Sequence, residues 1–377
     1  MNIAEITTYK EGGVYTYVKD LTKGINANII IITGNTKKLG YQRENGLMFY
    51  HIPCALSIRE IYFINPTGSY KKVKKILKEH KIDLIHFHNP LFTFITGFVM
   101  RPKLPLVMTA HYVVNVKSNK LTSFIFNRAI RLITLYISKK TDKIICHNED
   151  YINIFASWGV DRKKLVFIPT GVDTDKFSPG KSNIKKKLKC KNLVIFWGRL
   201  GYQKNIPLLI KAFKNIKTSD TKLVIVGKGP DMKKLNALAG KDGNIIFTGY
   251  LPDDKLLEYI RDADAAVLPS RGESWGLVIG EAMACELPVI SSDVGKAKEF
   301  IGEDRGIILK DETVEELTEK IDYLLNNKEM AKEMGKKARK MIVENYRWGK
   351  TIDETAELYK TVIKEFKNTH KNQDIVT

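Results

Sequence analysis

The chain has 377 residues, of which 44% are hydrophobic and 28% are charged. This composition excludes a largely disordered chain and a disulfide-stapled mini-protein, and the length suggests two domains of roughly 150 residues or more. No stretch approaches the ~18 uninterrupted apolar residues of a membrane-spanning helix, and the amino end lacks the basic region and apolar run of a signal peptide. The four cysteines form no CxxC pair. That fits a reducing compartment, so we expect a cytoplasmic protein.

The net charge of +20 is concentrated in the first half of the sequence. Residues 1–191 hold 32 Lys and Arg against 13 Asp and Glu, a net of +19, whereas residues 192–377 hold 30 against 29. A basic region favours an anionic partner, such as a nucleic acid, an acidic lipid surface or a phosphate-rich substrate. Solvated surface lysines explain the total charge as well, but they explain the asymmetry less well.

Short apolar, β-branched runs alternate with longer amphipathic runs in the first part of the chain. The predicted strands are residues 2–7, 28–33, 47–52, 83–87, 106–109, 143–146 and 164–168. The predicted helices are residues 14–23, 70–80, 91–100, 121–139 and 149–158. Alternating strands and helices predict parallel βαβ units.

Turn residues near 169–180 and a lysine cluster at 185–187 predict a domain boundary, after which the alternation restarts. Further strands are predicted at 193–197, 222–226, 244–247, 265–268 and 288–291, with helices at 205–216, 231–238, 254–261 and 276–285. The segments 313–326, 329–345 and 351–367 are helical in period.

The sequence therefore predicts an α/β fold with two doubly wound parallel-sheet, Rossmann-like domains that face a cleft. We expect a first domain at 1–175 and a second domain at 176–345. A C-terminal helix at about 346–368 would pack back on the first domain, and 369–377 would be a disordered tail. Such sheets bind ligands at the carboxyl ends of their strands.

Two glutamates mark the most specific motif, which runs from Arg271 to Ala284. Glu273 lies in a loop after a predicted strand, and Glu281 lies on the helix that follows. The amides at the start of that helix form a ready anion site. One of the two carboxylates could then hold hydroxyls on one side of a bound phosphate, and the other carboxylate could hold hydroxyls on the other side. On spacing alone, a helix-capping Glu273 and a solvated Glu281 are the simpler interpretation.

Two weaker motifs also follow predicted strands. Gly198-Arg199 and Lys204 come after a strand and open a helix, so both cations could reach a diphosphate. Gly12-Gly13 follows the first strand and would let the backbone approach a ligand closely. A pair of surface cations and an ordinary tight turn are the alternatives.

In combination, these residues resemble the glycosyltransferases of family 4, also called glycosyl transferases group 1, which have the GT-B fold. Other segments that match in order are 83–88, 109–111, 168–173, 226–230, 247–251 and 287–290, so the resemblance covers nearly the whole chain.

The resemblance implies a retaining hexosyl-type transferase of glycan biosynthesis that takes its sugar from a nucleotide donor. Residues 1–175 would then form the acceptor-side domain, and residues 176–345 the nucleotide-sugar-binding domain. Arg199 and Lys204 would neutralise the leaving diphosphate, Glu273 would hold the sugar, Glu281 would hold the ribose, and His111 would lie beside the sugar ring. The amide of Gly13 would approach the diphosphate. The full set of implied donor-binding residues is Gly12, Gly13, Gly198, Tyr250, Leu251, Gly276, Leu277, Val278 and Glu281. Glu299 falls where the family often has another acid, and its role stays open because the usual second glycine is missing.

No cofactor or metal is expected. Asp173-Thr174-Asp175 and Asp262-Ala263-Asp264 both read DxD, but neither is placed to hold a diphosphate beside Arg199. His86 and His88 share one strand face and could bind zinc with His111. The sequence offers no evident carboxylate or thiol partner, which favours core or cleft histidines whose hydrogen bonds are satisfied.

The basic first half suggests a lipid or lipid-linked acceptor and peripheral association with the inner face of the cell membrane. One predicted helix carries Lys71, Lys72, Lys74, Lys75 and Lys78. A second carries or adjoins Lys117, Lys120, Arg128, Arg131, Lys139 and Lys140. Basic helices with an apolar side bind anionic bilayers, although a core-facing helix with a solvated rim explains the second one equally well.

Two other functions remain open at this point. A nucleotide-sugar 2-epimerase shares the fold and needs no acceptor. A nucleic-acid- or membrane-binding protein without catalysis would explain the charge, but the basic segments hold few aromatics at stacking intervals and no nucleic-acid-binding motif, so no nucleic acid is expected.

Overall fold

The computed structural model describes residues 1–7, 13–35, 40–44, 46–58, 61–64, 66–88, 104–111, 120–241, 243–273 and 275–374. The chain divides into two compact units. Unit 1 comprises residues 1–169 together with 351–377, and unit 2 comprises residues 170–350. The sequence placed this boundary at residue 175, a few residues later than the structure does.

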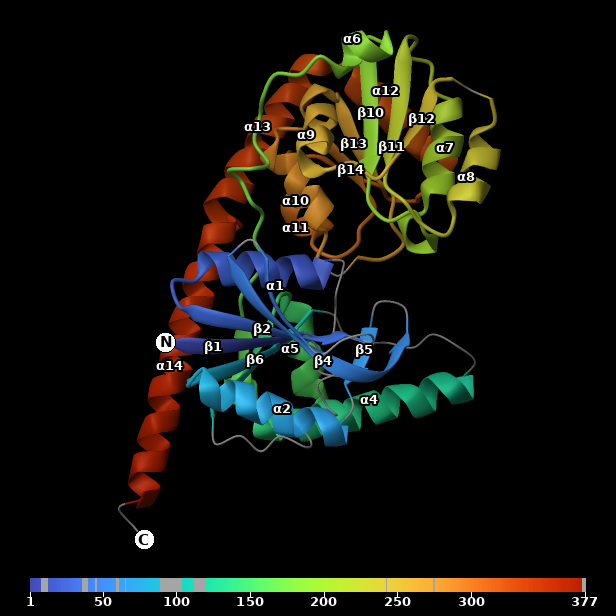
Figure 1. Cartoon of the computed structure of the whole chain (residues 1–377). Helices are drawn as coiled ribbons and strands as arrows, with labels where there is room; N and C mark the ends of the chain where they lie inside the picture. Colours follow the sequence, from blue (N-terminus) through green and yellow to red (C-terminus); the bar gives the residue numbers. More distant parts are fainter. Residues whose placement is uncertain are drawn as a thin grey trace. The chain divides into compact units, whose positions relative to one another are not determined.

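Unit 1 is built on one large sheet (Figure 1). Its strands are β1 (Asn2–Thr7), β2 (Asn28–Asn35), β3 (Gly40–Glu44), β4 (Leu47–Ile58), β5 (Ile61–Ile64), β6 (Leu84–His88), β7 (Leu106–Ala110), β8 (Lys143–Cys146) and β9 (Leu165–Phe167). Along the described sheet the order is β3-β4-β2-β1-β6-β7-β8-β9, and β5 pairs with β4. All pairs are parallel except those that β3 and β5 make with β4. The strand order reverses between β1 and β6, so a crevice opens there at the carboxyl ends of the strands.

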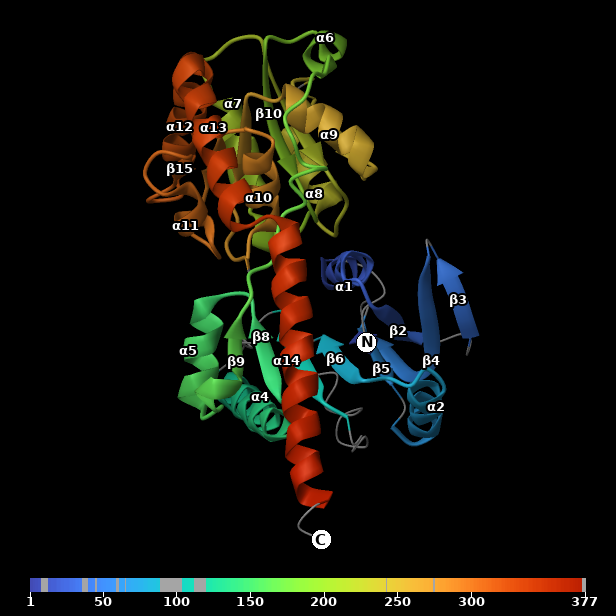
Figure 2. The ribbon, with the colours of Figure 1, turned by 90° about the vertical axis from the view of Figure 1, so that its left-hand side faces the viewer.

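Helices cover this sheet because their apolar faces pack on its β-branched strands. They are α1 (Gly13–Gly24), α2 (Pro66–Glu79), α4 (Lys120–Lys140), α5 (Glu149–Trp158) and the short 3₁₀ turn Arg162–Lys164. On α2, Val73 and Leu77 are buried against the core that Ile30, Ile32 and neighbouring strand residues form. The long helix α14 (Trp348–Asp374) runs the length of unit 1 (Figure 2). Its residues Thr355 and Tyr359 are fully buried.

Unit 2 has a parallel sheet with strand order β12-β11-β10-β13-β14-β15. Its strands are β10 (Asn192–Trp197), β11 (Thr221–Val226), β12 (Ile245–Gly249), β13 (Ala265–Leu268), β14 (Val289–Ser291) and β15 (Ile307–Ile308). Numbered from the first strand of the unit, the order is 3-2-1-4-5-6, that of dinucleotide-binding folds. The switch point lies between β10 and β13.

The helices of unit 2 lie on both faces of its sheet, with α7 and α8 on one side and α9 and α10 on the other (Figure 1). They are α6 (Ile184–Leu188), α7 (Ile206–Lys214), α8 (Met232–Ala239), α9 (Asp253–Asp262), α10 (Leu277–Ala284), α11 (Ala297–Ile301), α12 (Val314–Asn326) and α13 (Lys328–Asn345), with a 3₁₀ turn at Tyr202–Lys204. The central strand β10 is buried along its whole length, so the unit closes around a continuous apolar core.

The predicted α/β class with two doubly wound sheets is confirmed. The bounds of β1, β8 and α5 match the predicted segments residue for residue. Strands β3 and β5 were not predicted. The residues of β3 are polar and largely exposed, so they lack the apolar pattern that marks a strand. The predicted helix 91–100 lies outside the described residues.

The prediction of a disordered tail from residue 369 is wrong for residues 369–374, because α14 runs to Asp374. Among the helices of the described part, none has the length and apolar character that a membrane crossing requires.

The charge is shared differently once the units are known. Unit 1 holds 29 Lys and Arg against 16 Asp and Glu, a net of +13, and unit 2 holds 33 against 26, a net of +7. The first-half total of +19 was larger because the lysine-rich segment 176–191 belongs to unit 2. Unit 1 is therefore the more basic one, but unit 2 is not neutral.

Candidate active site

The predicted residues of unit 2 gather at the carboxyl edge of its sheet. Arg199 follows β10 and Glu273 follows β13, so the two residues come from the strands that flank the switch point. Tyr250 and Leu251 follow β12 at the same edge. Because parallel strands end at one edge, segments that are more than seventy residues apart in the sequence are placed around one crevice.

The loops after β10 and β13 are tied to each other. The backbone N–H of Arg271 donates to the carbonyl of Gln203 at 2.7 Å, and its guanidinium donates to the carbonyl of Tyr202 at 2.9 Å. The same guanidinium lies over the Tyr202 ring, 4.4 Å from its centroid. These contacts span the switch point and fix the position of Glu273 relative to Lys204.

Lys204 and Glu273 form an ion pair in this structure. Each side chain keeps 21% of its exposure, and the hydroxyl of Ser270 donates to the same carboxylate oxygen at 2.8 Å. A lysine ammonium has three N–H groups, so Lys204 can hold Glu273 and still donate to an anion on its open side. The residue predicted to bind a phosphate and the residue predicted to bind a sugar are thus immediate neighbours.

Arg199 is exposed and makes no ion pair with any other described residue. It follows Gly198, whose amide donates to the carbonyl of Val226 at 3.0 Å. That contact brings the backbone of β10 and β11 together at their carboxyl ends. A side chain at Gly227 would be impossible there, because its Cβ would lie 1.9 Å from the carbonyl oxygen of Gly198.

The helix α10 begins at this edge with Gly276 in the left-handed region, at φ +88°. The amides of Leu277 and Val278 come before the hydrogen bond that the N–H of Ile279 donates to the carbonyl of Gly276 at the start of the helix. Amides at a helix start carry partial positive charge and favour an anion. The predicted anion site therefore lies beside the ion pair of Glu273.

Glu281 lies one turn into α10, and its carboxylate accepts a hydrogen bond from the indole N–H of Trp197 at 2.9 Å. Burial raises the pKa of Glu281, although the Trp197 hydrogen bond and the charge of Lys176 oppose that shift. Trp197 is the last residue of β10, and its role was not predicted. The one sequence feature that could have indicated it is a single tryptophan at the end of an apolar strand. Glu281 is therefore a held, half-buried carboxylate and not the solvated helix residue of the simpler interpretation.

Tyr250 is 68% exposed, whereas Leu251 is half-buried and packs against the core of unit 2. Two predicted residues belong to unit 1: Gly13 is the first residue of α1 and is exposed, and half-buried His111 directly follows β7. Gly12 lies outside the described residues.

Glu299 has structural partners. Its carboxylate pairs with the buried Lys296 and accepts a hydrogen bond from the Tyr346 hydroxyl. Lys296 lies three residues before Glu299 on the same segment, and its ammonium is the cation that pairs with the Glu299 carboxylate. Gly295 remains a glycine because its backbone is left-handed, at φ +59°, and a Cβ there would lie 3.2 Å from the Cβ of Glu273.

The two DxD sequences have other partners. The carboxylate of Asp262 accepts from the N–H of Lys185 at 2.6 Å, and that of Asp264 accepts from the N–H of Leu193 at 2.8 Å. Leu193 lies at the amino end of β10, at the opposite edge of the sheet from Arg199. Asp173 accepts from the N–H of Lys176 in a local turn at 3.0 Å.

One expectation about unit 1 is wrong. His86 and His88 do have a carboxylate partner, Glu5, which lies in the middle of β1 with no exposure. Its Oε2 lies 2.6 Å from Nε2 of His88 and 3.0 Å from Nδ1 of His86. No local pattern predicts this contact, because Glu5 is 83 residues from His88 and is a single acid in an apolar strand. Both histidines are buried and hydrogen-bonded, as the favoured interpretation expected.

Unit 1 also contains a hollow of about 700 Å³ that none of the predicted site residues lines. It lies at the amino ends of β1 and β2, beside Asn2, Asn28 and His80. Ligands of doubly wound sheets bind at the other edge, so we do not assign the site to this hollow.

Comparison with known proteins agrees with this geometry. Residues 11–176 match the model of Glycosyltransferase Family 4, and residues 179–341 match the model of Glycosyl transferases group 1. Together the two matches take in most of the chain, which therefore belongs to the family 4 glycosyltransferases and is a transferase with the GT-B fold.

The relatives cover nearly the full chain at low identity. An uncharacterized glycosyltransferase of Methanocaldococcus jannaschii, MJ1069, is 28% identical over 93% of this chain and 95% of its own length. The GPI3 subunit of the phosphatidylinositol N-acetylglucosaminyltransferase of Saccharomyces cerevisiae is 24% identical over 84% of this chain and 72% of its own. Among solved structures, Anabaena HepE in complex with UDP and glucose superposes with a TM-score of 0.77 at 17% identity, over 96% of this chain and 100% of that one.

Proposed function

We propose that this glycosyltransferase moves a sugar from a nucleotide-sugar donor to an acceptor with retention at the anomeric carbon and without a metal ion. The observation that carries the proposal is the pairing of Lys204 with Glu273 across the switch point of unit 2, beside the exposed Arg199. The crystal structure of Anabaena HepE with UDP and glucose supports a nucleotide-sugar donor, because that protein shares the fold.

The chemistry follows from where charge develops. As the bond between the sugar and the diphosphate breaks, negative charge builds on the leaving diphosphate. Preorganised cations at that position stabilise the transition state more than the ground state. Arg199 and Lys204 provide two such cations, and the amides of Leu277 and Val278 add partial positive charge.

The two glutamates would divide the donor between them. Glu273 lies against Lys204, so it would accept hydrogen bonds from hydroxyls of the sugar beside the diphosphate. Glu281 is held by Trp197 on the first turns of α10, where it would accept from the ribose hydroxyls. Carboxylates accept two or more hydrogen bonds each, so both suit vicinal hydroxyls.

The proposal includes a membrane-linked acceptor. On α2, Lys71, Lys72, Lys74, Lys75 and Lys78 are all exposed, while Val73 and Leu77 point into the core. Within the described part of the chain, Lys75 is the one lysine of this set that forms an ion pair, with Glu79 at 3.6 Å. On α4, Leu132 is 58% exposed, directly follows the exposed Arg131 and comes one helical turn after the exposed Arg128. A cationic face with an apolar residue among its charges suits an anionic bilayer, and the relative GPI3 is named for a phosphatidylinositol substrate.

A screen of nucleotide sugars by thermal denaturation tests the donor. A ligand at 100 times its Kd stabilises the folded protein by about 2.7 kcal/mol, which raises the apparent Tm by several degrees. The expected result is stabilisation by one class of nucleotide sugar and transfer from it to an acceptor with the anomeric configuration kept. Free epimer formed without an acceptor would instead identify a 2-epimerase.

A further inference from the structure

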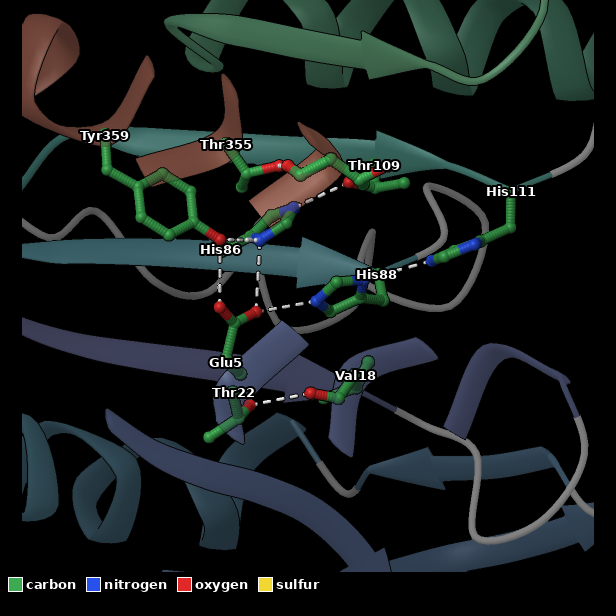
Figure 3. Close-up of polar contacts among 10 residues, drawn as sticks. Glu5, Val18, Thr22, His86, His88, Thr109, His111, Thr355 and Tyr359 are labelled. Carbon is green, nitrogen blue, oxygen red and sulfur yellow. Dashed lines mark hydrogen bonds and ion pairs between the residues drawn. The ribbon is translucent and has the colours of Figure 1, made fainter. Parts of the chain in front are cut away.

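A hydrogen-bonded network of polar side chains in unit 1 begins in the core and ends at the carboxyl edge of the sheet (Figure 3). Glu5 on β1 contacts His88 at the end of β6, and His88 contacts His111, which follows β7. Oε1 of Glu5 accepts from the hydroxyl of Tyr359 at 2.9 Å, and Oε2 faces the two histidines of β6. Glu5, His86, His88 and Tyr359 are all fully buried.

The donors and acceptors of this network determine which ring nitrogen of each histidine carries a proton. Burial opposes ionisation of Glu5, but the charge and hydrogen bond of His86 and the hydrogen bond of His88 hold its pKa well below the usual range. An ionised carboxylate only accepts hydrogen bonds, so the ring nitrogen of His88 that faces it, Nε2, must carry a proton. Burial and the neighbouring His86 lower the pKa of His88 to about 4, so at neutral pH the ring has one N–H and its Nδ1 is an acceptor.

The tautomer of His88 in turn determines the tautomer of His111. Nε2 of His111 lies 3.0 Å from Nδ1 of His88, and because that Nδ1 accepts, Nε2 of His111 must donate. Burial, with the nearby His147 and His88, lowers the pKa of His111 well below its usual value, so this ring is neutral as well. Its single proton is then on Nε2, and Nδ1 is left with a lone pair.

Packing holds the His111 ring in that orientation. The Tyr17 ring of α1 lies edge-on to it with centroids 4.9 Å apart, and the His147 ring after β8 lies 5.2 Å away. His88, His111 and His147 therefore line the ends of three neighbouring strands, at the edge where ligands of such sheets bind.

We propose that Glu5 and His88 are positioning residues that fix His111 in its Nε2–H tautomer, so that Nδ1 accepts a hydrogen bond from a hydroxyl of a substrate bound at the carboxyl edge of the unit 1 sheet. This inference rests on the proposed function, in which the substrate that supplies the hydroxyl is a sugar. It assigns a role to Glu5, a buried carboxylate that takes no part in the proposed diphosphate site or in the cationic face of α2. The site would select a sugar with a free hydroxyl at that position over its deoxy or O-methyl analogue, because an unpaired acceptor in a buried site costs binding.

The atoms of Glu5, His86 and His88 also lie close enough together to hold a metal ion. The hydrogen-bonded arrangement is favoured because all three side chains are fully buried and their facing atoms are 2.6–3.0 Å apart, at hydrogen-bond length. A metal would also replace the proton on Nε2 of His88, so the two arrangements give opposite spectra.

The test is NMR of the full chain with ¹⁵N-labelled histidine, with His111 assigned by its loss in His111→Asn. We expect a pyridine-like Nδ1 and a pyrrole-like Nε2 for His111. His88→Phe should remove this preference and give mixed tautomers. It should also lower kcat/KM by about tenfold, the cost of one hydrogen bond to a substrate hydroxyl, while the Kd of the bare nucleoside diphosphate is unchanged.

Tyr359→Phe is the matched control, because it removes one hydrogen bond to Glu5 outside the path to His111. It should keep the wild-type tautomer. A protonated Nδ1 in the wild type, stoichiometric bound zinc, or an unchanged tautomer in folded His88→Phe would each overturn the inference. The wild-type spectrum decides even if His88→Phe does not fold. Failure of the proposed function would look different, since no nucleotide sugar would then stabilise the protein whatever the tautomer.

Discussion

Replacing Lys204 with alanine should nearly abolish transfer while leaving the fold almost as stable as before. The structure separates the two effects. In the ion pair with Glu273 each side chain keeps 21% exposure, and partly solvated pairs of this kind contribute ~0.2–1 kcal/mol to stability. Glu273 also keeps its hydrogen bond from Ser270. We therefore expect the free energy of unfolding to fall by about 1 kcal/mol or less.

The effect on catalysis should be several times larger. Removing one preorganised group that stabilises developing charge costs about 10²–10³ in kcat, or roughly 2.7–4 kcal/mol. Lys214→Ala is the matched control: Lys214 is a cation on α7 of the same unit whose ammonium binds the carbonyl of Leu238, and no role in the site is assigned to it. Steady-state transfer rates and denaturant unfolding curves of both variants provide the comparison. A folded Lys204→Ala enzyme with wild-type turnover would refute the proposed role of Lys204 at the diphosphate. A loss of turnover no larger than that of Lys214→Ala would refute it as well.

Three further predictions follow from the site and the surface. Glu273→Gln should impair transfer more than binding of the nucleoside diphosphate, whereas Glu281→Gln should weaken binding of the nucleoside diphosphate as well, because its expected partner is the ribose. Calorimetric titration measures both; equal losses of affinity for the diphosphate and for the full donor in both variants would contradict this division. Transfer should persist in excess chelator, and activity that vanished with chelator and returned with magnesium or manganese would show that a metal is needed. The protein should float with vesicles that contain anionic lipid at low salt and be released at high salt. Changing Lys71, Lys72, Lys74 and Lys75 to Gln should remove about 4 kcal/mol of that binding, at about 1 kcal/mol per cation, whereas the same change at Lys186, Lys187, Lys189 and Lys191 of unit 2 should have little effect; protein that stayed in solution with anionic vesicles at low salt would exclude a membrane surface as partner.

The donor side of the site could be predicted from the sequence because its residues lie in short segments. Arg199 and Lys204 are five residues apart, and Glu273 and Glu281 flank one helix start, so each motif carries its own local pattern of glycine, charge and strand end. The strand order that unites them at one switch point follows from the βαβ alternation.

The core of unit 1 could not be predicted in the same way. Glu5 meets His88 across 83 residues and Tyr359 across 354, and no local pattern records contacts of that range. A glutamate in the run Asn2–Thr7 resembles a solvated strand residue until the neighbouring strands are known. The charge asymmetry was overestimated for a related reason: the basic segment before Asn192 lies in unit 2, and only the tertiary contacts show where the units divide.

The central claim is that the crevice between β10 and β13 binds the diphosphate of a nucleotide sugar through Arg199 and Lys204. Calorimetric titration with the nucleoside diphosphate of the stabilising donor, in the presence of chelator, tests it most directly. If Arg199 and Lys204 hold the diphosphate, the wild type and Lys214→Ala will bind it with the same Kd, and Arg199→Ala and Lys204→Ala will bind it at least tenfold more weakly. Equal Kd values in all four proteins, or no binding to the wild type, would contradict it.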